Sequence, residues 1–336
     1  MDQPSHIIDP DGEVIILLRK KSLKESPVDE PPIDEPPVEE PIQEPVSGPL
    51  EESCLRIQVS AKHLILASSV FKKILTGGWK ESVTYLQKGS VEITAESWDI
   101  EALLILLRAI HGQQYHVPRK LTLEMLAKVA VLVDYYDCKE SVYIWSTIWI
   151  DALEEKVPKT YSRDLLLWLW ISCVFQLPAQ FKESTSTVMS WSDGWINSLE
   201  FPIPFKVMEA MNRYREEAIS NLVTLLHDTR EALLSGTRGC CFECSSIMYG
   251  ALTKEIRSVD LFLARPEAPF PGLNYKDLVR KVLSFTVPRW NTRRSPIPGH
   301  TSSPFSQHSC SDSSFKALFG NLNDNIQGLD LHDLIP

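Results

Sequence analysis

Residues 59–75 constrain the fold more than any other stretch, because the spacing of apolar residues changes there. Up to Val59 the apolar residues alternate with polar ones, as in a half-buried strand: Leu55, Ile57 and Val59. After it they follow helical spacing: Leu64, Ala67, Phe71 and Leu75. Ser68 and Ser69 can end one helix and cap the next. None of these side chains is equipped for catalysis, so the sequence predicts a strand followed by two short helices that build a surface.

This segment resembles the signature of the BTB/POZ domain. The matching residues are Val59, His63, Leu64, Leu66, Ala67, Ser69, Phe71 and Leu75, and Asp11 begins a stretch that resembles the first strand of that domain. Downstream, 91–93 resembles its third strand, and 98–111 and 121–136 resemble its later helices. The resemblance covers residues 9–150 and is greatest to BTB/POZ proteins of filamentous fungi.

The resemblance implies an α+β domain, a small sheet with a helical cluster, that binds proteins and catalyses no reaction. BTB/POZ domains form homodimers or serve as adaptors between a cullin-type ubiquitin ligase scaffold and a substrate, and others recruit transcriptional partners. We therefore expect a scaffold or adaptor whose partners are proteins, either a cullin-type scaffold or a second copy of the chain.

An acidic, proline-rich segment interrupts this region at residues 25–52. It contains ten carboxylates, eight prolines and no Lys or Arg. Proline prevents helix formation and the like charges repel, so the segment is expected to be a disordered loop between two strands. It is either a tolerated insertion or a docking strip for a basic or proline-recognising partner.

The charge balance of the remaining sequence argues against direct binding of nucleic acid, and the length of its apolar runs argues against a membrane-spanning helix. The net charge of −10 comes entirely from the acidic segment, since the rest contains 34 acidic and 34 basic residues. The longest largely apolar run, 165–175, is about half as long as a membrane-spanning helix. No secretory signal is visible, and seven irregularly spaced cysteines favour a reducing compartment. We expect an intracellular protein, cytoplasmic or nuclear.

Residues 158–288 have the pattern of an all-helical region. Helices are expected over 161–177, 206–235, 244–263 and 275–285, the second with one possible break. The tryptophans at 145, 149, 168 and 170 lie among Leu and Ile at helical spacing and are expected in the core. From 289 to 336 Ser, Pro, Asn, Gly and Asp dominate, which predicts a disordered tail.

Cys240, Cys241 and Cys244 form the cysteine cluster of the sequence. The last two have the C-x-x-C spacing that suits zinc or a redox pair. A structural zinc site needs four ligands, and the sequence offers no second C-x-x-C. Proximity to a helix N-terminus would lower the pKa of such a thiol. We expect no metal and no cofactor, with these three cysteines as the weak candidates.

Two alternatives to an adaptor remain open. Arg289, Arg293 and Arg294 precede Ser295-Pro296, as in a nuclear-import patch beside a phosphorylation site, which would suit a transcription-associated regulator acting through other proteins. A thiol or metal-dependent enzyme at Cys240–Cys244 is the other. No nucleotide-binding glycine loop and no hydrolase or metalloprotease motif occurs, so we do not expect an enzyme.

Overall fold

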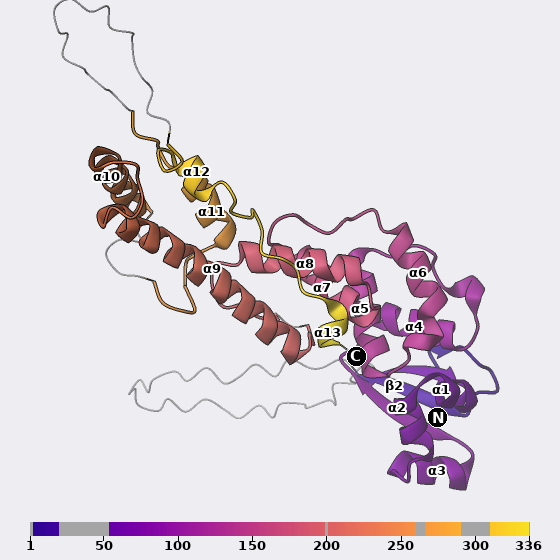
Figure 1. The fold of residues 1–336 in the computed structure, drawn as a ribbon. Helices are drawn as coiled ribbons and strands as arrows, with labels where there is room; N and C mark the ends of the chain where they lie inside the picture. The colour runs from indigo at the N-terminus through magenta and orange to yellow at the C-terminus, as the bar shows by residue number, and fades with distance from the viewer. Residues whose placement is uncertain (1–2, 20–53, 199–200, 260–265, 290–309, 336) are drawn as a thin grey trace, which may run out of the picture. The chain divides into compact units, whose positions relative to one another are not determined.

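The computed structural model describes residues 3–19, 54–198, 201–259, 266–289 and 310–335. The chain forms two compact units, Met1–Leu153 and Glu154–Pro336 (Figure 1). The acidic segment 25–52 lies outside the described residues, as do Arg293 and Arg294. Among the described helices, none has the length and apolar character that crossing a bilayer requires.

The N-terminal unit contains a four-stranded sheet in the order β1-β3-β2-β4. Its strands are β1 (His6–Ile7), β2 (Val14–Arg19), β3 (Leu55–Val59) and β4 (Val91–Glu96). β2 is antiparallel to β3 and parallel to β4. Alternation along β4 buries Val91, Ile93 and Ala95. The two strands predicted on either side of the acidic segment are therefore confirmed as β2 and β3, which pair with each other; β1 was not predicted.

The helices of this unit agree with the predicted order and add one. They are α1 (Ala61–Ala67), α2 (Ser69–Thr76), α3 (Lys80–Lys88), α4 (Ile100–Ile110), α5 (Leu123–Tyr135) and α6 (Tyr143–Ala152), with 3-10 turns at Gln114–His116 and Lys139–Val142. α3 was missed, because its sequence KESVTYLQK has few buried residues. The unit is thus a mixed α+β structure.

The core of the N-terminal unit is built around α4. Seven of its eleven residues are buried, as expected for a helix with apolar side chains nearly all round. Asp99 caps it by accepting hydrogen bonds from the amides of Glu101 and Ala102. The second carboxylate oxygen of Asp99 pairs with Lys128 of α5 at 2.8 Å, which joins the two helices.

The C-terminal unit is helical. Its helices are α7 (Arg163–Val174), α8 (Pro178–Trp191), α9 (Phe205–Leu234), α10 (Phe242–Ser258), α11 (Tyr275–Leu283), α12 (Phe315–Phe319) and α13 (Leu331–Leu334). α9 runs its thirty residues without the break that the sequence allowed. α8 was missed: the sequence predicts a helix that stops at 177, whereas Pro178 occupies the first turn of a further helix. All four tryptophans expected in the core are buried.

The prediction of a disordered tail is wrong for residues 310–335. Phe315 and Phe319 of α12 pack against Phe285, and the chain then runs along α8 (Figure 1). Hydroxyl groups of α8 bind its backbone: Ser190 accepts from the amide of Ile326, and Thr185 accepts from that of Leu329. The segment is too polar to predict a helix from its own pattern; contacts with a distant helix order it.

Arg215 of α9 is the largest buried polar side chain among the described residues. Its guanidinium donates to four backbone carbonyls, those of Ser192, Pro269, Phe270 and Leu273, at 2.7–3.1 Å. These bonds attach the end of α8 and the turn before α11 to the middle of α9. Burial lowers the pKa of Arg215, although a guanidinium stays charged in proteins.

Candidate functional site

The signature residues lie where β3 ends and two short helices begin, as the sequence predicts. Asp11 lies in the turn before β2, Val59 ends β3, and the remaining signature residues lie on α1 and α2. Four are buried: Val59, Leu64, Phe71 and Leu75. His63 and Ser69 are exposed, and Leu66 is 88% exposed. The motif therefore combines a buried anchor with a face that contacts solvent.

His111, which ends α4, holds the junction between β3 and α1. Its Nδ1 lies 2.7 Å from the carbonyl of Leu107, and its Nε2 accepts from the amide of Ser60 at 3.0 Å. Its ring stacks on His63 with centroids 4.9 Å apart. Burial lowers the pKa of His111, with a smaller contribution from His63. The neutral ring matches both hydrogen bonds, so His111 has a structural role.

Ser68 separates α1 from α2 and attaches them to α5. Its hydroxyl accepts from the amide of Phe71 at 3.0 Å and donates to the carbonyl of Tyr136. The ring of Tyr136 stacks on that of Phe71 with centroids 4.4 Å apart. The capping role predicted for this serine pair is confirmed for Ser68, while Ser69 donates to the carboxylate of Asp137 instead.

α3 carries an apolar face that no described residue of the unit covers. Trp79, its N-cap, and Val83 and Leu86 are 58%, 44% and 79% exposed, and their spacing of four and three residues places them on one side. Ser82, next to this side of the helix, is fully buried, and α3 packs against α2 and β4. Figure 1 shows α3 at the edge of the unit, away from α4 and α6. We call Trp79, Val83 and Leu86 the α3 face.

The cysteine cluster differs from the one that the sequence predicted. The sulfurs of Cys240, Cys244 and Cys310 lie within 4.8 Å of one another, and Cys241 lies outside this group. The sulfurs of Cys244 and Cys310 are 3.5 Å apart, and those of Cys240 and Cys241 are 3.9 Å apart. None of the chain's seven cysteines forms a disulfide. Cys310 was missed, because the tail was expected to be disordered.

The predicted lowering of thiol pKa values is also wrong. Cys241 does cap a helix, α10. The pKa of Cys240 is nevertheless raised to about 12, by desolvation first and then by the thiols of Cys241 and Cys310. The pKa of Cys244 is raised by burial and by Cys310. Desolvation is the largest cause of the raised pKa at both thiols, because it disfavours the charged thiolate.

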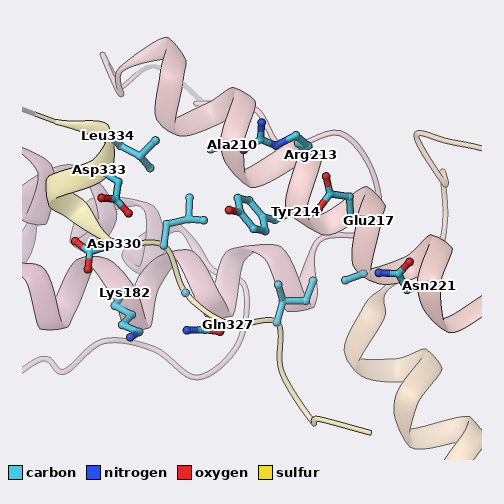
Figure 2. Close-up of a pocket in the computed structure, with 14 residues that line it drawn as sticks. Lys182, Ala210, Arg213, Tyr214, Glu217, Asn221, Gln327, Asp330, Asp333 and Leu334 are labelled. Carbon is cyan, nitrogen blue, oxygen red and sulfur yellow. The ribbon is translucent and has the colours of Figure 1, made fainter.

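A cavity of about 650 Å³ lies in the C-terminal unit between α9, α8 and the final segment. Figure 2 shows Arg213, Tyr214 and Glu217 extending from α9 and Lys182 from α8, opposite Asp330 and Asp333. Its lining mixes side chains of both charges with apolar ones, Ile326, Leu329 and Leu334 among them. A ligand pocket is usually more apolar than this, so the cavity does not point to a ligand.

Comparisons of the chain with family models, curated proteins and solved structures found no match.

Proposed function

We propose that the chain is a non-catalytic protein-interaction module, an adaptor of the BTB/POZ kind that docks a cullin-type scaffold protein through its N-terminal unit. The observation that carries this proposal is the α3 face. Its three large apolar side chains are exposed on a helix that packs against α2 and β4. Aromatic side chains such as Trp79 are enriched at protein interfaces, and the fully buried centre of an interface is more apolar than its rim.

The construction around residues 59–75 supports the same proposal. Ser68, His111 and Tyr136 fix α1 and α2 by hydrogen bonds and ring contacts, and α2 packs against α3. The α3 face is thus held by a rigid support before a partner arrives, which lowers the entropic cost of association. The resemblance of the same residues to the BTB/POZ signature supplies the class of partner.

Charge substitutions on α3 test which surface binds. Val83→Glu combined with Leu86→Glu places two carboxylates on the α3 face. If the face is buried on docking, the Kd for a purified cullin-type scaffold protein, measured by isothermal titration calorimetry, should rise about 100-fold. A wild-type Kd that the double variant leaves unchanged would contradict docking through this face.

The matched control changes the charge of the same helix by the same amount outside the face. Thr84 and Lys88 lie four residues apart, on the side away from Trp79, Val83 and Leu86. Thr84→Glu with Lys88→Gln should leave the Kd within about threefold of the wild-type value. Both double variants should retain the wild-type thermal midpoint, because all four side chains are at least partly exposed.

A second copy of the chain is the other partner of the α3 face that the resemblance implies. Its binding would appear as a solution mass twice that of the chain in the absence of any scaffold protein. The same substitutions at Val83 and Leu86 would then return the mass to that of one chain. The nuclear-regulator alternative rests on Arg293 and Arg294, which are not among the described residues.

A further inference from the structure

The spacing of the cysteine sulfurs in the C-terminal unit matches thiolate coordination of a metal ion. Thiolates lie about 2.3 Å from zinc, so neighbouring sulfurs of a tetrahedral site are about 3.8 Å apart. The two measured separations, 3.5 Å for Cys244–Cys310 and 3.9 Å for Cys240–Cys241, lie close to this value. We propose that Cys240, Cys244 and Cys310 bind Zn²⁺ as thiolates and that Cys241 supplies the fourth.

The backbone next to Cys240, Cys241 and Cys244 lets the turn before α10 lie close to the first turn of that helix. Gly239 adopts a φ of +95°, and a side chain there would come within 3.0 Å of the backbone of Ser245. Cys241 is the N-cap of α10 and Cys244 is its third residue, so both lie at the N-terminus of a seventeen-residue helix, which is the positive end of its dipole. This end favours thiolates once a metal ion has displaced the protons.

Contacts that do not involve sulfur bring Cys310 to the other cysteines. The carboxylate of Asp312 accepts from the amide of Gly239 at 2.9 Å and lies 3.5 Å from the guanidinium of Arg238. Ser313 donates to the carbonyl of Cys310 at 2.7 Å, which shapes the turn. The segment that carries Cys310 is therefore positioned by its own polar contacts, as the supporting residues of metal sites usually are.

The fourth position is open to Cys241. Its side chain is exposed, so a rotation about its own bonds meets little packing, and its sulfur already lies 3.9 Å from that of Cys240. A ligand set of four thiolates excludes solvent, which is typical of structural rather than catalytic zinc. The ion would then link the turn between α9 and α10 to the start of the final segment.

A disulfide between Cys244 and Cys310 is the competing use of these thiols. It would need the two sulfurs to approach from 3.5 Å to about 2.05 Å. It would also leave Cys240 beside an oxidised pair with no role. Zinc uses all the cysteines of the group without oxidation, so the arrangement favours zinc.

Metal analysis of the full-length chain, purified under reducing conditions with added Zn²⁺, tests the proposal. We expect one equivalent of zinc per chain. Co²⁺ in its place should give the intense visible bands of tetrahedral thiolate coordination. Adding Zn²⁺ to chelator-treated protein should raise the thermal midpoint, whereas Mg²⁺ should not. Protein with neither bound zinc nor a change in midpoint would overturn the proposal.

Single substitutions assign the ligands. Cys240→Ser, Cys244→Ser and Cys310→Ser should each reduce bound zinc to well below half an equivalent, and Cys241→Ser should weaken zinc binding at least tenfold. Cys54→Ser in the other unit is the control and should retain one equivalent. Full zinc in Cys310→Ser would overturn the site. A native mass lower by two hydrogens would show the disulfide instead. Circular dichroism of each variant separates loss of ligand from loss of fold.

Discussion

At the scale of single residues, the signature separates into side chains that support the fold and side chains that face solvent. Phe71 is 1% exposed and stacks on Tyr136, whereas Leu66, five residues earlier, is 88% exposed. Burial and not residue type decides what each contributes, because an apolar side chain stabilises a fold only by leaving water.

Phe71→Ala should therefore lower the free energy of unfolding of the N-terminal unit by about 3–5 kcal/mol. Two terms contribute: the removed ring atoms no longer gain free energy by leaving water, and a cavity remains next to Tyr136. Leu66→Ala is the control and should change it by less than about 0.5 kcal/mol. Urea unfolding monitored by circular dichroism measures both, and equal effects would contradict the assignment of Phe71 to the core.

His111 predicts a pH dependence. Burial lowers its pKa below the unfolded value of 6.5, so the unfolded chain takes up a proton first as the pH falls. The contribution of neutral His111 to the free energy of unfolding is complete above about pH 6.5, and it is lost as the pH falls through the pKa of His111 in the folded state. The charged groups that act on it are Asp9, which opposes the shift, and His63, which adds to it.

His111→Gln should reduce this acid sensitivity. The difference in urea midpoint between about pH 7.5 and about pH 5 should be smaller in the variant than in the wild type. His116→Gln, on the exposed turn after α4, is the control and should behave as the wild type. An unchanged pH dependence in His111→Gln would mean that other groups cause the acid sensitivity.

At the scale of elements, the sequence predicted a helix where the apolar pattern of its own residues was sufficient, and missed it where contacts with distant residues or solvent mattered. α4 and α7 were predicted because their own apolar residues fill a core from several sides. α3 and α8 were not, because α3 has an apolar side that contacts solvent and α8 is rich in Ser and Thr, whose hydroxyls bind a segment about 140 residues away. Distance along the chain also hid Cys310, which is 66 residues from Cys244, since nothing near it in sequence indicates the cluster at 240–244.

Arg215 is an element-scale contact because it attaches two backbone segments, the end of α8 and the turn before α11, to α9. Arg215→Met should lower the free energy of unfolding of the C-terminal unit by about 3 kcal/mol, since four carbonyls, two of them in buried hydrogen bonds, lose their donor. Arg213→Met is the control on the same helix, where the side chain is exposed, and should change it little. Chemical denaturation measures both, and equal effects would contradict this role.

At the scale of the whole molecule, the sequence predicted two regions with a boundary between 150 and 158, and the structure divides after Leu153. It also predicted that the acidic segment can be removed. β2 and β3 pair from Val14–Val59 to Leu18–Leu55, so the hairpin is defined without that segment. Deleting residues 27–49 should shift the thermal midpoint by less than about 5 °C, measured by calorimetry. A larger fall would mean that the segment packs against the fold.

The most direct test of the docking proposal is the molar mass of the full-length chain in solution, alone and mixed with a purified cullin-type scaffold protein. The proposal predicts the mass of a single chain in the first sample and the summed mass of a one-to-one complex in the second. Two separate, unchanged masses in the mixture would contradict it.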